Sequence, residues 1–216
     1  MMMIILTIVF SNMFRFDIPS YPVYLLVGQL VYGFYSEATS MAMTSILGGA
    51  SLIKKVSLPK YIFPLSRVLS CFTTMLLSLI ALFLVMAEEG IVFQETLLLL
   101  PAILVHLLLF CVGMGLILSV LVVFFRDMLH LYGVILTALN FLTPIFYPAN
   151  LLPDWLQEGL VYNPLYDYIT FFRKIAVYGQ WPTLEEHMYC LIFSFGSLLL
   201  GMYVFKKNQN EFILYV

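Results

Sequence analysis

Few residues in this sequence could carry out chemistry, and those present do not form a recognisable site. His106, His130 and His187 lie on three different segments, and their spacing matches no metal-binding pattern. The sequence contains no GxxxxGK[ST] phosphate loop, so we expect no ATP bound in that manner. No nucleophile is grouped with a base and an orienting residue. We therefore expect neither an enzyme nor a metal or cofactor site in this chain.

Two charged residues, Glu37 and Arg67, lie inside apolar stretches of the chain. Charges within membrane-spanning helices are costly and are often functional. Each of the two lies at a similar distance from one end of its stretch, and the two stretches are consecutive and antiparallel. We predict that they form an ion pair. Such a pair could gate a path or could only neutralise two costly charges, and the sequence favours neither role.

The composition explains why these residues are isolated. The chain is 62% hydrophobic and 10% charged, whereas soluble domains carry about 25% charged residues. We therefore expect an all-α bundle of membrane-spanning helices within a single transmembrane domain over residues 1–216. The apolar runs long enough, or nearly long enough, to cross a bilayer are residues 22–43, 61–87, 96–125, 129–148 and 187–205, preceded by a shorter run at 1–14.

The distribution of lysine and arginine predicts the orientation of these helices. If residues 44–60 face the cytoplasm, most basic residues lie inside, most acidic residues lie outside, and the C-terminus is cytoplasmic. Residues 148–186 then lie outside. Within them, Asn163 and Pro164 are typical of a helix start and Gly179 of a helix end. We predict two short re-entrant helices here, dipping into the outer leaflet.

A stripe of polar and small residues follows one face of the first complete helix: Tyr24, Gly28, Tyr32, Tyr35 and Thr39. Packing and an interfacial position would explain Tyr24. They explain Tyr32 and Tyr35 less well, because these two should lie deeper in the membrane. Aromatic rings and hydroxyls could instead line a path for a sugar polymer, as they line other ligand sites. Both interpretations of Tyr24, Tyr32, Tyr35 and Thr39 remain open at this point.

The segment GGASLIKKVSLPKYIFP, residues 48–64, interrupts the apolar sequence. Its two glycines can end a helix, and Pro59 and Pro64 prevent a long one. Residues 50–58 are left as a short amphipathic piece that carries Lys54 and Lys55. By charge alone, a basic loop resting on anionic lipid headgroups would explain it.

Two long segments resemble the permease subunit of ABC type-2 exporters. They are NMFRFDIPSYPVYLLVGQLVYGFYSEATSMAMTSILGGASLIKKVSLPKYIFPLSRVLS and VVFFRDMLHLYGVILTALNFLTPIFYPANLLPDWLQEGLVYNPLYDYITFFR. The specific combination of motifs is ASLIKKVSLPKYIFPLS with FFRD, TPIFYP and YNPL. Within that family, the similarity is to the polysaccharide and polyol-phosphate exporters, which include the O-antigen and teichoic acid permeases.

The resemblance implies six membrane helices per permease, a permease homodimer in the bacterial plasma membrane, and two copies of a separate ATPase that binds Mg-ATP. It implies outward movement of a lipid-linked glycan through the dimer seam. The family begins with an amphipathic helix and a full first span, so residues 1–14 resemble the end of a truncated first helix. The helix that couples to the ATPase corresponds to Ala50, Ser51, Leu52, Ile53, Lys54, Lys55, Val56, Ser57 and Leu58.

Three alternatives stay open. The chain could export a drug or a lipid as a member of the same superfamily. It could be an inactive truncated fragment or a membrane scaffold without transport activity. An intramembrane enzyme is disfavoured because the catalytic groups are missing. In every case we expect contact with membrane lipid and no nucleic-acid partner.

Overall fold

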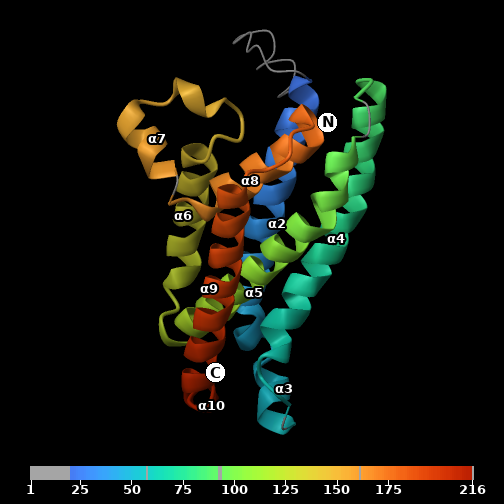
Figure 1. The fold of residues 1–216 in the computed structure, drawn as a ribbon. Helices are drawn as coiled ribbons and strands as arrows, with labels where there is room; N and C mark the ends of the chain where they lie inside the picture. Colours follow the sequence, from blue (N-terminus) through green and yellow to red (C-terminus); the bar gives the residue numbers. More distant parts are fainter. Residues whose placement is uncertain (1–19, 57, 92–93, 161, 216) are drawn as a thin grey trace.

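The computed structural model describes residues 20–56, 58–91, 94–160 and 162–215, and these residues form a bundle of helices without strands (Figure 1). The all-α prediction is confirmed. The helices in chain order are α2 (Tyr21–Gly48), α3 (Ala50–Lys55), α4 (Ile62–Glu88), η1 (Glu95–Leu99), α5 (Leu100–Phe124), α6 (Met128–Leu142), η2 (Ala149–Leu151), α7 (Asp154–Leu160), α8 (Pro164–Arg173), the π-helical η3 (Lys174–Tyr178), α9 (Leu184–Asn208) and α10 (Phe212–Tyr215).

Three helices in the described part of the chain are long and apolar enough to cross a membrane. They are α4, the continuous helix Glu95–Phe124 formed by η1 and α5, and α9. They match the predicted spans at 61–87, 96–125 and 187–205. The predicted span at 22–43 is helical too, as α2, but this 28-residue helix does not reach the same hydropathy. The predicted partial span at 1–14 lies outside the described residues.

The predicted span at 129–148 is too long, because α6 ends at Leu142. Thr143 is extended, with φ −83° and ψ 128°, and it precedes Pro144. A residue before proline is biased away from helical geometry, since the proline ring clashes with it. The 15 residues of α6 rise about 22 Å, which is shorter than the hydrocarbon core of a bilayer.

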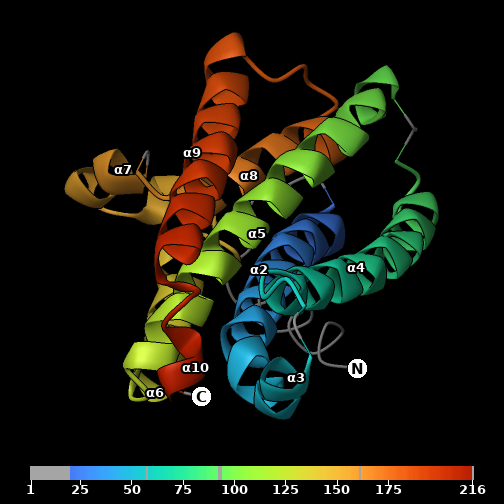
Figure 2. The same ribbon diagram turned by 90° about the horizontal axis from the view of Figure 1, so that it is seen from below.

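Helix α5 lies at the centre of the bundle, between α9 on one side and the α2–α4 pair on the other (Figure 2). Gly113 of α5 packs directly on the backbone of Ser197, and Gly201 of α9 packs on Gly113. Gly115 faces Ala42 of α2 instead. These small residues allow α5 to approach both α9 and α2 closely.

The two ends of the bundle differ in character. The short helices α3 and α10 lie at one end, next to the C-terminus, while α7 and the start of α2 lie at the other (Figure 1). We refer to these as the inner and outer ends, following the predicted orientation. At the outer end, the Asn163 side chain caps α8 by accepting a hydrogen bond from the Leu165 amide, and Gly179 stops η3 with φ 58°. The predicted helix boundaries in this region are confirmed.

Candidate functional site

The short helix α3 lies on the inner end and is attached to it by one buried side chain. Ile53 packs into a cluster with Ile46, Leu116 and Phe205, which come from α2, α5 and α9. Gly49 makes the tight turn into α3 possible, because a side chain there would collide with the Phe63 ring. The cluster places α3 beside the inner ends of three long helices.

The remaining side chains of α3 point away from the bundle. Leu52 of α3 is 44% exposed, and Val56, the extended residue that follows the helix, is 46% exposed. Lys54 and Lys55 are exposed beside them, and Leu58 follows with 41% exposure. Ser57 lies outside the described residues. The exposed surface of α3 thus combines apolar contact area with two positive charges, as a docking surface for a soluble partner would.

Lys60 anchors the segment that follows α3. Its ammonium group donates a hydrogen bond of 2.6 Å to the Gln209 carbonyl and lies 5.9 Å from the centre of the Phe212 ring. The segment after α3 is therefore held against the C-terminal end of α9 and against α10. A basic loop that only rested on lipid headgroups would leave Lys60 without a protein partner. In the structure, Lys60 is bonded to the Gln209 carbonyl.

The tyrosine stripe of α2 lies inside the bundle. The hydroxyl of Tyr24 donates to the Tyr147 carbonyl and that of Tyr32 to the Leu136 carbonyl. Tyr35 is 4% exposed and stacks on Phe110, and Thr39 is fully buried. These four predicted path residues hold α2 against its neighbours in the chain, and among them Tyr24 alone lines a cavity of the described residues, at the outer end.

Tyr132 extends this arrangement to α6. Its hydroxyl donates a hydrogen bond of 2.6 Å to Thr39 Oγ1, which in turn donates to the Tyr35 carbonyl at 2.6 Å. This chain of bonds satisfies polar groups that are fully enclosed. The role of Tyr132 was not predicted from the sequence, because its partner is 93 residues away in the chain.

The predicted ion pair between Glu37 and Arg67 is not formed. Within the described ranges, the side chains that meet as an ion pair are those of Lys174 and Glu186. Glu37 and Arg67 are both exposed, and they line two different cavities between α2 and α4. Sequence spacing placed them at similar depths, but it did not fix the rotation of either helix about its axis.

Two separate cavities lie between α2 and α4, and we refer to them together as the α2–α4 groove. It includes one cavity of about 370 Å³ that contains Glu37 and another of about 490 Å³ that contains Arg67. The hydroxyls of Ser66, Thr74 and Ser78 each donate to a carbonyl of their own helix, which leaves their oxygens able to accept hydrogen bonds. The polar residues that line the groove are Gln29, Glu37, Ser45, Ser51, Ser66, Arg67, Ser70, Thr74 and Ser78.

The outer end carries a buried arginine. Arg173 is 4% exposed and donates hydrogen bonds to the carbonyls of Tyr24, Pro144 and Ile145 at 3.3, 2.8 and 2.7 Å. Its guanidinium lies 3.4 Å from the centre of the Tyr24 ring, a cation–π contact. Burial lowers the pKa of Arg173 to about 10, so the side chain remains charged at neutral pH.

Arg173 thus joins α8 to α2 and to the segment after α6. The sequence did not single out Arg173 as a structural residue. A signal was present, because position 173 follows Ile169 by four residues and therefore lies beside the apolar face of α8.

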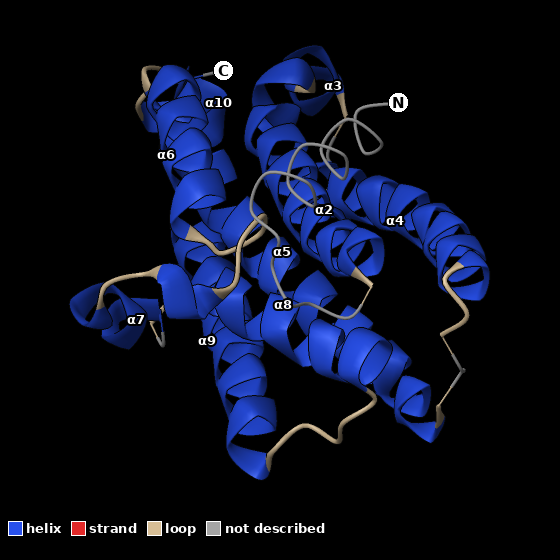
Figure 3. Cartoon of the chain, turned by 90° about the horizontal axis from the view of Figure 1, so that it is seen from above, coloured by secondary structure: helices blue, strands red, loops and turns tan. Residues whose placement is uncertain are grey.

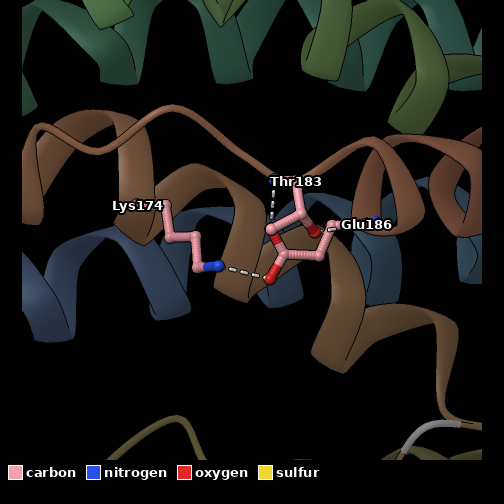
Figure 4. Close-up of polar contacts among 3 residues, drawn as sticks. All are labelled: Lys174, Thr183 and Glu186. Carbon is pink, nitrogen blue, oxygen red and sulfur yellow. Dashed lines mark hydrogen bonds and ion pairs between the residues drawn. The ribbon is translucent and has the colours of Figure 1, made fainter.

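Next to it, Lys174 forms an ion pair with Glu186 at the start of α9 (Figure 4). Glu186 also accepts a hydrogen bond from the Thr183 amide, and the Thr183 hydroxyl accepts one from the Glu186 amide. This reciprocal arrangement is a capping box that fixes the first turn of α9. The pair therefore ties the start of η3, directly after α8, to the first turn of α9.

The comparisons with known proteins agree with this architecture. The sequence pattern of the ABC-2 type transporter family matches residues 1–177. The chain is 25% identical to the O-antigen export system permease protein RfbA of Klebsiella pneumoniae over 210 residues, which cover 94% of this chain and 79% of that protein. It is 26% identical to the protein of the same name from Myxococcus xanthus over 212 residues, which cover 97% of this chain and 82% of that protein. From the family match and the helical architecture together, we conclude that the chain belongs to the ABC-2 type transporter family of membrane permeases.

Proposed function

We propose that this chain is the permease subunit of an ATP-driven exporter that moves a lipid-linked cell-surface polysaccharide, or a teichoic-acid-like polymer, outward across the plasma membrane. The substrate class follows from similarity to permeases named for O-antigen export. A separate ABC ATPase in two copies would bind Mg-ATP and drive a homodimer of this chain.

The observation that carries the proposal is the construction of α3. An exposed apolar pair with two lysines offers a partner contact, and buried Ile53 connects that contact to α2, α5 and α9. Nucleotide-driven movement of the ATPase would tilt α3 and shift the population between inward- and outward-open arrangements. The C-terminus lies at the same end as α3, which fits a cytoplasmic position for both (Figure 1).

For the substrate path we propose the α2–α4 groove in place of the tyrosine stripe. Glu37 lies about 16 Å before the end of α2, at the depth of the hydrocarbon core. A carboxylate at that depth needs water or protein beside it rather than lipid. Glu37, Arg67 and the nearby hydroxyls supply polar groups to two cavities whose lining also includes Leu30 and Phe34, and this mixed lining suits the polar and apolar faces of a glycan.

Co-purification with ABC ATPases from the same genome tests this function. We expect the intact permease to retain one ATPase and to raise its rate of ATP hydrolysis. The double variant Lys54→Glu/Lys55→Glu should lose the partner, because it reverses the charge of the exposed face of α3. Lys206→Glu/Lys207→Glu is the matched control, since these lysines are exposed at the same end but belong to α9. Equal ATPase retention by the two double variants would overturn the proposal.

A further inference from the structure

A cavity of about 370 Å³ opens at the outer end of the bundle, away from both α3 and the α2–α4 groove. It lies between the start of α2, the segment from Pro144 to Asn150, α8 and η3, on the end that Figure 3 faces. Its size falls within the range of small-ligand sites. We call it the outer cavity.

The charge around the outer cavity is positive. Arg173 and Lys174 line it, and none of the described lining residues is acidic. Lys174 is paired with Glu186, whereas every hydrogen bond of Arg173 goes to a backbone carbonyl. A guanidinium has five N–H donors, and three are used here. A buried cation without a carboxylate partner favours an anion nearby, since burial strengthens electrostatic attraction.

The remaining lining suits a sugar ring. Tyr178 is 40% exposed and Tyr166 is half-buried, so both have ring surface available, while the ring of Tyr24 is covered by Arg173. Aromatic side chains combine an apolar face with a polar hydroxyl, which matches the mixed surface of a sugar. The hydroxyl and amide groups that complete the lining belong to Asn150, Thr170 and Gln180.

One face of α8 places these groups together. Tyr166, Thr170 and Arg173 follow one another at helical spacing and line the cavity, whereas Leu165, Tyr168 and Phe172 face the core. Gly28 allows the guanidinium to enter, because an added Cβ there would lie 2.8 Å from Nη2. The cationic end of the site is therefore built into the junction of α2 and α8.

We propose that the outer cavity binds an acidic sugar unit, a uronate or a phosphate-substituted sugar, of the polymer that leaves the transporter. The proposal rests on the proposed export function and adds a recognition site at the exit. The carboxylate or phosphate would lie in the field of Arg173 and Lys174, and the sugar ring would contact Tyr178. The headgroup of an anionic lipid offers the same charge at this depth, and the experiment separates the two sources.

Saturation-transfer NMR on the full-length permease in phosphatidylcholine nanodiscs tests the site, with glucuronic acid as the probe and glucose as the neutral control. We expect transfer to glucuronic acid and about tenfold weaker binding in Tyr178→Ala. Tyr162→Ala is the matched control, because Tyr162 is 83% exposed beside α8 and does not line the cavity. Arg173 is left unchanged, since its three carbonyl contacts make it part of the fold.

The proposal is supported if transfer persists in nanodiscs containing phosphatidylglycerol and if binding is weakened in Tyr178→Ala but not in Tyr162→Ala. Three results would overturn it: absence of transfer, equal transfer in the two tyrosine variants, or complete displacement by phosphatidylglycerol, which would assign the site to lipid. No ATPase is needed for this measurement. A permease that binds glucuronic acid but retains no ATPase would contradict the export function and leave the site intact.

Discussion

Gly28 of α2 and Arg173 of α8 fit together so closely that no side chain can be added between them. The Cβ of an alanine at position 28 would lie 2.8 Å from Nη2 of Arg173 and 3.1 Å from Cγ2 of Ile145. The guanidinium that occupies this space holds three carbonyls from two other segments. The contact connects α8 and the segment after α6 to α2, the first described helix of the bundle.

Gly28→Ala should therefore destabilise the permease by about 1–3 kcal/mol, the usual cost of overpacking. The measurement is thermal unfolding of the purified protein in detergent. Gly33→Ala is the control on the same helix, because nothing lies within 4 Å of a Cβ at that position. This control should be neutral or stabilising by up to about 1 kcal/mol. Equal destabilisation by both substitutions would contradict the fit described here.

The contact between α5 and α9 makes a second prediction. Gly201→Ala should lower the yield of folded protein strongly, because the added Cβ would overlap the Gly113 carbonyl. Backbone cannot move aside as a flexible side chain can, so α9 must shift as a whole. Gly196→Ala lies on the same helix in open space and should fold normally. Size-exclusion profiles of the two variants give the comparison, and a normal profile for Gly201→Ala would count against the packing.

The hydrogen bond from Tyr132 to Thr39 predicts the effect of removing one hydroxyl. Tyr132→Phe should cost about 1 kcal/mol, since Thr39 Oγ1 then loses a buried donor. Tyr203→Phe, at a side chain that is 65% exposed, should change the unfolding temperature little. If both substitutions behave alike in thermal unfolding, the α2–α6 contact is weaker than the structure indicates.

Asp167 predicts a pH dependence. Its Oδ2 atom is buried with no hydrogen-bond partner in the described part of the chain. Burial, with the Glu186 charge as the second cause, raises the pKa of Asp167 from 3.8 to about 7. The folded state then holds a proton that the unfolded state releases, so the stability contribution is full below about pH 3.8 and is lost as the pH rises to about 7.

Asp167→Asn should accordingly raise the unfolding temperature at pH 8 by about 2–4 °C, the shift expected for about 1 kcal/mol at this chain length. The gain should vanish near pH 4, where the native carboxyl is also neutral. Asp154→Asn, at an exposed carboxylate, should show no such pH-dependent gain. A constant difference between Asp167→Asn and the native protein at both pH values would refute the titration.

Local signals were readable from the sequence, whereas relations between helices were not. Asn163, Pro164 and Gly179 act within a few residues of themselves, and the structure confirms the helix boundaries that they predicted. The long apolar runs likewise predicted α4, α5 and α9, because a bilayer requires length and apolarity. The end of α6 was missed, although Pro144 gave a local signal for it.

The candidate site depends on contacts between helices, which the sequence did not predict. The tyrosine stripe of α2 was correctly placed on one face, but the sequence did not say whether that face turns toward the protein or toward a path. The neighbours that bury it, such as Tyr132 and Phe110, come from distant segments. The same reason explains why Glu37 and Arg67 do not pair. Whether two side chains meet depends on the rotation of each helix about its axis, and not only on their depth in the membrane.

The central claim is that α3 contacts the ATPase, and photocrosslinking tests it directly. A benzophenone amino acid at Leu52 of the full-length permease should crosslink to the co-expressed ATPase. The same group at Leu98, which is 79% exposed at the opposite end of the bundle, should give no crosslink. A complex that retains the ATPase but crosslinks to it from neither position, or equally from both, would contradict the account.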